Sequence, residues 1–139
     1  MKRAWLQPFT WAVIVETNRQ LCAPKAALHK PTSDGYEPTR QLWETTHRTE
    51  MTLAEAADLC RRCHRRAPFC SFNGNTFVAV IRKVIAALPL APESAAALRS
   101  LADELVKIIS KELMEIEITG TIDRPITRMR ECIEITNAL

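Results

Sequence analysis

The chain has 139 residues, of which 47% are aliphatic, aromatic or cysteine and 25% are charged. These proportions are typical of a globular protein and exclude an intrinsically disordered chain. The length fits a single domain, residues 1–139, with a sizeable buried core. The net charge is only +3, so the total charge identifies no class of partner, and its distribution along the chain matters more.

Cysteine usage and hydropathy indicate a reduced, aqueous environment. The five cysteines are an odd number at irregular spacing, unlike the disulfide framework of a small secreted protein. No apolar run approaches the ~20 residues that a membrane helix needs, and the N-terminal sequence does not resemble a secretion signal. We therefore expect a cytoplasmic protein without a membrane segment.

Residues 5–21 are compatible with either a helix or a strand. Their apolar positions follow a helical stripe, and Pro8 fits the first turn of a helix. The consecutive β-branched residues at 13–15 also fit a buried strand. A helix is the preferred interpretation. The alternative is an α+β fold with a small sheet formed by residues near 11–17 and 115–122.

An irregular loop or arm is expected at about residues 22–38, because this segment contains three prolines and a Ser-Asp-Gly turn signal. A short helix should follow at 39–50, directly behind Pro38. The next boundary is marked more sharply. Thr52 and Glu55 have the spacing of a capping box, which satisfies free backbone amides at a helix N-terminus.

The remaining chain is also helical in pattern. Residues 52–88 form two amphipathic runs separated by a short loop, which is typical of a helical hairpin. Residues 92–118 place apolar side chains on one side and charged ones on the other, and a last helix is expected from Asp123 onward. The expected fold is all-α: a compact bundle of five or six helices around the central hairpin.

The Cys-Arg-Arg-Cys-His sequence at 60–64 divides into two faces of one helix. On a helical wheel the thiols and the imidazole lie among alanines, and the arginines lie opposite. Metal binding, with zinc as the cofactor, is an alternative function in which the ligands would be Cys60, Cys63, His64 and Cys70. Structural zinc sites usually draw on two separated cysteine pairs, and buried cysteines pack as small hydrophobes. We therefore expect a core face without a cofactor.

The opposite face of this helix carries the functional hypothesis. Six basic residues and no acidic one occur between Asp58 and Glu93, so the arginines are expected to lie far from local acids. Guanidinium groups suit phosphate and carboxylate ligands. We predict a non-enzymatic binding or adaptor module, either self-associating or a subunit of a larger assembly, that contacts nucleic-acid phosphates or an acidic protein surface. The residues assigned to this contact are Arg61, Arg62, Arg65, Arg66, Arg82 and Lys83.

The loop of the hairpin is a second candidate site. Gly74 is expected to supply a positive φ, and Asn75 or Thr76 to cap the following helix. Backbone amides at a helix start can hold an anion, so the candidate ligand-binding residues are Asn73, Gly74, Asn75 and Thr76. No nucleophile is spaced with a base and no two carboxylates are paired, so the sequence favours no enzymatic activity.

Overall fold

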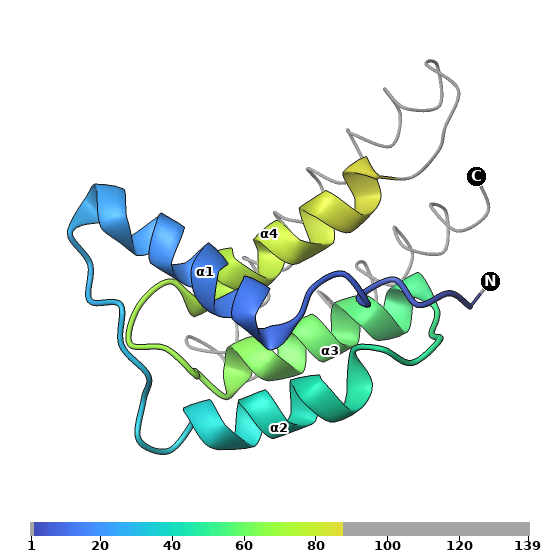
Figure 1. Ribbon diagram of the computed structural model, residues 1–139, viewed down its shortest axis with the longest axis horizontal. Coiled ribbons are helices and arrows are strands. Elements are labelled where there is room, and N and C mark those ends of the chain that lie inside the picture. The colour runs from blue at the N-terminus through green and yellow to red at the C-terminus, as the bar shows by residue number, and fades with distance from the viewer. Residues whose placement is uncertain (1, 88–139) are drawn as a thin grey trace, which may run out of the picture. The chain divides into compact units, whose positions relative to one another are not determined.

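The computed structural model describes residues 2–87, which are mainly α-helical (Figure 1). The chain divides into two units, Met1–Ile81 and Arg82–Leu139, and of the second only the last turns of one helix are described. Four α-helices, one 3-10 helix and no strand occur within the described range, so the all-α expectation is confirmed there. The helices expected at 92–118 and from Asp123 onward, and the strand alternative near 115–122, lie outside the described residues.

The first helix, α1, comprises Trp11–Cys22 and begins later than expected. The Thr10 hydroxyl accepts a backbone N–H of the first turn at 3.4 Å, and Pro8 precedes the helix. Residues 11–17 are therefore helical, and the α+β alternative is wrong for this segment. β-branched residues lower helix propensity only slightly, and burial of Ile14 in the core outweighs that cost.

The irregular segment is shorter than the predicted 22–38. A 3-10 helix, η1 (Ala23–Lys25), continues α1, and α2 comprises Tyr36–Thr46. Pro38 lies inside the first turn of α2, whereas the sequence interpretation placed it before the helix. A proline is tolerated there because the amides of a first turn have no helical acceptor to lose. The irregular stretch is therefore limited to residues 26–35.

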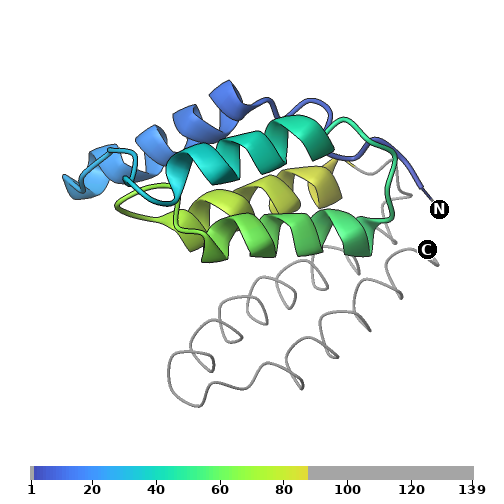
Figure 2. The ribbon, with the colours of Figure 1, turned by 90° about the horizontal axis from the view of Figure 1, so that it is seen from below.

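The third helix, α3, comprises Leu53–Arg65, and the fourth, α4, comprises Asn73–Ala86. The predicted start of α3 is confirmed, because the Thr52 hydroxyl accepts the backbone N–H of Glu55 at 3.1 Å. In the first unit α2 lies beside α3 (Figure 1), and α1 lies beside α2 (Figure 2). None of the helices in residues 2–87 has the length and apolarity needed to cross a membrane.

Trp43 of α2 connects three parts of the core. Its side chain is fully buried, and its indole N–H donates to the carbonyl of Phe9 at 2.7 Å. Its ring stacks on His47 and packs against Phe77 of α4, each at a centroid distance of 5.9 Å. This one side chain therefore holds the N-terminal segment, α2 and the start of α4 together.

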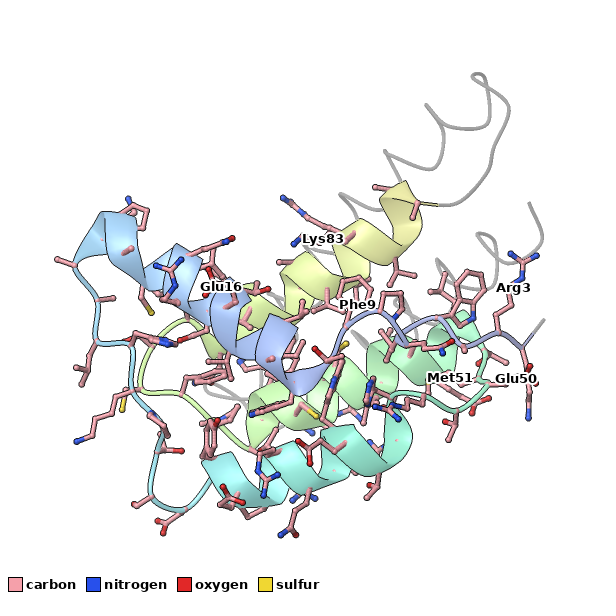
Figure 3. All side chains as sticks on the ribbon, in the orientation of Figure 1. Arg3, Phe9, Glu16, Glu50, Met51 and Lys83 are labelled. Carbon is pink, nitrogen blue, oxygen red and sulfur yellow. The ribbon has the colours of Figure 1, made fainter. Side chains whose placement is uncertain are left out.

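Two short antiparallel bridges hold the ends of α3. Arg3 and Met51 exchange two backbone hydrogen bonds of 2.9 Å, and Figure 3 shows these residues side by side. Met51 is buried directly before the Thr52 cap. Beyond the opposite end of α3, a second bridge joins Pro31 to Phe69. The N-terminal segment is thus fastened at one end of the helix, and the irregular stretch is fastened at the other.

Candidate functional site

The inner side of α3 is closed to solvent, as the helical wheel predicts. The buried residues on this helix are Leu53, Ala56, Ala57, Leu59, Cys60 and Cys63. Leu59 extends the closed side beyond the predicted thiol-and-alanine face. His64 is only partly buried, and Ala67 is exposed because α3 ends before it. The conspicuous cysteines are therefore core residues.

Burial keeps both thiols of α3 protonated. It raises the pKa of Cys63 to about 12, although the nearby charges of Arg62 and Arg66 act in the opposite direction. Burial, together with the charge of Cys63, raises the pKa of Cys60 well above its ordinary value. The thiolate is the form that ligates metals and attacks electrophiles. At neutral pH neither group is in that form.

The proposed metal ligands do not form a cluster. Within residues 2–87, no three side chains of His, Cys, Asp or Glu lie close enough to hold one metal ion. Cys70 is exposed beyond the helix, with its Sγ 4.0 Å from the carbonyl of Pro31. The zinc alternative on Cys60, Cys63, His64 and Cys70 stays a prediction, and the described geometry does not support it.

The outer side of α3 contains an acid among its arginines. Asp58 Oδ1 accepts hydrogen bonds from Arg61 Nη2 at 2.7 Å and Nε at 3.2 Å, and Asp58 Oδ2 lies 3.3 Å from Arg62 Nε. The expectation that the arginines lie far from local acids is wrong, because spacings of three and four residues bring side chains together on a helix. The Arg61 side chain is only 13% exposed, so it contributes little to an open surface.

Three arginines of α3 and its C-cap remain open to solvent. They are Arg62, Arg65 and Arg66, which we call the α3 arginine face. In the part of the chain that the structure describes, no ion pair joins Arg65 or Arg66 to a carboxylate. Cations at a helix C-terminus are stabilised by the partial charge of the last carbonyls. That interaction accounts for a positive charge at this end, but not for a cluster of guanidinium groups.

The backbone that carries the last two arginines is held in place by the irregular stretch 26–35. The Thr32 hydroxyl donates to the carbonyl of Ala67 at 2.6 Å, and the Thr32 backbone N–H donates to the carbonyl of Pro68 at 2.9 Å. A Cβ at Gly35 would collide with carbonyl oxygens at the end of α3, so this position requires glycine. The arginine face therefore has a rigid base, although its side chains are exposed.

The second candidate site, at 73–76, is the first turn of α4. Asn73 Oδ1 accepts the backbone N–H of Phe69 at 2.9 Å, and Asn73 Nδ2 donates to the carbonyl of Phe69 at 2.7 Å. Thr76 is buried, and its hydroxyl donates to the backbone carbonyl four residues earlier at 2.8 Å. The prediction that Asn75 or Thr76 caps this helix is wrong, because α4 already begins at Asn73.

Gly74 is needed for space and not for a positive φ. A Cβ there would lie 2.9 Å from Cε1 of His64, whose ring covers this position. The positive φ values near the turn belong to Ala67, at 46°, and Phe72, at 59°. Of the four candidate residues only Asn75 is exposed. The side chains of this second site thus serve mainly to close the turn.

A buried polar network on α1 was missed in the sequence. Asn18 is fully buried, and its Nδ2 donates to the carbonyl of Ser71 at 2.7 Å and to Thr76 Oγ1 at 3.1 Å. Its Oδ1 lies 2.8 Å from Nδ1 of His29. Because Nδ2 already donates twice, Oδ1 is the acceptor and His29 Nδ1 carries the proton. The sequence does contain one indication of this burial. Asn18 follows the apolar Ile14 by four residues, which places both on the same side of the helix.

The last two predicted contact residues, Arg82 and Lys83, belong to the second unit. Both are exposed on the last turns of α4. In the first unit, the candidate site therefore consists of the α3 arginine face. No protein family, curated protein or solved structure matches the chain.

Proposed function

We propose that the protein is a non-enzymatic binding module, acting as an adaptor or a subunit of a larger assembly, that engages an anionic partner through the α3 arginine face. Nucleic-acid phosphates are the preferred ligand class, and an acidic protein surface is the alternative. We place this activity in the cytoplasm, where the free thiols of Cys22, Cys60, Cys63 and Cys70 remain reduced.

The exposure of Arg65 and Arg66 at a fixed helix end is the observation that supports this proposal. Neither guanidinium group has a carboxylate partner among residues 2–87. Uncompensated like charges on adjacent turns destabilise a helix slightly, and an anionic ligand would remove that cost. Guanidinium donors form a planar fork that matches phosphate oxygens.

The spacing of the face suits a phosphate backbone. Arg62, Arg65 and Arg66 are separated by one, three and four residues, and pairs three or four apart have Cβ atoms about 5–6 Å from each other on a helix. Contact with about three phosphates predicts that the logarithm of the binding constant falls with the logarithm of salt concentration with a slope of roughly −2 to −3. No base-reading motif accompanies the face in the sequence, so binding should depend little on nucleotide sequence.

Fluorescence anisotropy with labelled single- and double-stranded oligonucleotides, over a range of salt concentrations, tests the proposal. The double variant Arg65→Glu and Arg66→Glu should lower affinity by at least about tenfold, because each reversal replaces an attraction by a repulsion. The matched control is Lys25→Glu with Arg48→Glu, which makes the same change in net charge at exposed positions elsewhere in the first unit. Circular dichroism should show unchanged helix content in both variants.

Three outcomes separate the possibilities. A loss confined to the arginine-face variant supports the proposal. Equal losses in both variants would show that net charge alone drives binding, and the α3 site would be rejected. If oligonucleotides fail to bind but polyglutamate is retained by the wild type and released by the arginine-face variant, the acidic-protein alternative is the correct one.

A further inference from the structure

The start of α4 requires an Asn-Gly pair, for two separate structural reasons. The Asn73 side chain accepts the backbone N–H of Phe69 at 2.9 Å and donates to the carbonyl of the same residue at 2.7 Å, which requires both an acceptor and a donor. Gly74 leaves room for the ring of His64, which a Cβ would approach to 2.9 Å. Phe69, which the amide holds, is 2% exposed. The buried turn therefore depends on both residues of the pair.

This pair is also the dipeptide most susceptible to deamidation, because glycine offers no side chain that hinders the reaction. The backbone nitrogen of Gly74 loses its proton and attacks Cγ of Asn73. A new C–N bond closes a five-membered succinimide, the bond from Cγ to Nδ2 breaks, and ammonia leaves. Water then opens either carbonyl of the ring and gives aspartate or isoaspartate. The net change is hydrolysis of an amide, without oxidation or reduction.

The folded turn blocks the first step. Ring closure requires the Asn73 carboxamide to rotate onto the following nitrogen and the Asn73 backbone to leave its helical conformation. Both polar atoms of the carboxamide are held by Phe69, and the His64 ring covers Gly74. The reaction therefore needs local opening, which breaks two hydrogen bonds and exposes Phe69.

We propose that Asn73 is a latent modification site, protected while the turn is closed and deamidated when it opens. The modified turn should also be unable to close again. An aspartate at this position has no donor for the Phe69 carbonyl and would place a carboxylate oxygen where Nδ2 now lies, 2.7 Å from that carbonyl. An isoaspartate would lengthen the backbone at the first residue of α4. Either product prevents the turn from closing as before, whether or not the arginine face binds an anion.

Peptide mapping by mass spectrometry of the full chain measures the reaction. The protein is incubated in mildly alkaline buffer with and without urea, and conversion of Asn73 to aspartate and isoaspartate is followed over time. Conversion should be slower in the native protein by at least about tenfold, because only the open population reacts. Equal rates in the two conditions would overturn the proposed protection.

Whether the turn can close after deamidation is tested with the variant Asn73→Asp. This variant should unfold at a lower temperature than the wild type. The control is Asn75→Asp, which adds the same charge at an exposed position of the same helix start. Since a negative charge is favourable there, the control should match or exceed the wild type. An Asn73→Asp variant as stable as the wild type would show that the turn can close after deamidation and would overturn this part of the proposal.

Discussion

The two sides of α3 come from one short stretch of sequence, residues 60–66 and the turn before it, but the fold uses them differently. On the inner side, Cys60 and Cys63 are buried in the core, and burial raises the pKa of both thiols. On the outer side, Asp58 pairs with Arg61 and with Arg62 Nε. Arg65 and Arg66 remain exposed. The comparison teaches that the more conspicuous residues, the two cysteines, are accounted for by core packing, whereas the exposed arginines are not.

The largest effect should come from the inner side. Replacing Leu59, which is 1% exposed, by alanine should lower the free energy of unfolding by about 2–5 kcal/mol through lost burial and a residual cavity. Arg65→Ala, on the outer side, should change it by less than about 1 kcal/mol, the range of a helix-end charge interaction. Equilibrium urea denaturation measures both. Comparable losses in the two variants would contradict the division of the helix.

Cys63→Ser tests whether the inner side is core or metal site. The substitution places a hydroxyl without a described partner in a fully buried position and should lower the free energy of unfolding by about 1–3 kcal/mol. Elemental analysis of both proteins, purified without added metal, should show the same zinc content. Near-stoichiometric zinc in the wild type that is lost in the variant would instead support the metal-binding alternative.

Asp58→Asn should strengthen the proposed function of the outer side. It removes the carboxylate that binds Arg61 and Arg62 and that repels an incoming anion. Oligonucleotide affinity should rise by about two- to fivefold, the scale of an exposed ion pair. Glu55→Gln removes the same charge one turn earlier and keeps the capping box, so its smaller gain serves as the reference. If the two variants gain equally, Asp58 has no special relation to the arginines.

The smallest expected effect is the pH dependence of stability that arises from His64. Both the buried inner side of α3 and Arg65 on the outer side act on this residue. Burial, and then the charge of Arg65, lower the pKa of this imidazole. The unfolded chain therefore binds a proton more readily than the folded one. The stability contribution is present above the unfolded pKa of about 6.5 and is lost as pH falls through the lower, folded value. The melting temperature should thus decline on acidification, and it should decline less in His64→Gln. If the melting temperatures of the wild type and the variant decline equally, His64 is not a source of the pH dependence.

The parts of α3 that the sequence predicts correctly depend on local spacing. Thr52 and Glu55 satisfy each other within one turn, and the apolar stripe requires only the helical period. Asp58 could also have been found in this way, since it precedes Arg61 and Arg62 by three and four residues. The stretch without acids begins only after Asp58, so the charge pattern of that stretch alone does not reveal the pairing with Arg61 and Arg62.

The turn between α3 and α4 could not be predicted in the same way. Ala67 and Phe72 adopt left-handed backbone conformations that neither residue prefers. Tertiary contacts impose them: Phe69 between these two residues stacks on Trp11 at 5.9 Å and packs against Tyr36 at 6.1 Å. These partners are distant in sequence, so no local signal indicates that α4 begins at Asn73, before either expected cap residue, Asn75 or Thr76.

The buried amide of Asn18 sets an order of events during synthesis of the chain. Its two acceptors, Ser71 and Thr76, lie 53 and 58 residues later in the sequence. When α1 leaves the ribosome, neither acceptor has been synthesised, and burying the amide before Thr76 emerges would leave one of its native hydrogen bonds unmade. Such distant contacts delay folding, because a long loop must close before they form. The hydrogen bonds that satisfy this buried amide therefore form only after the start of α4 has been synthesised.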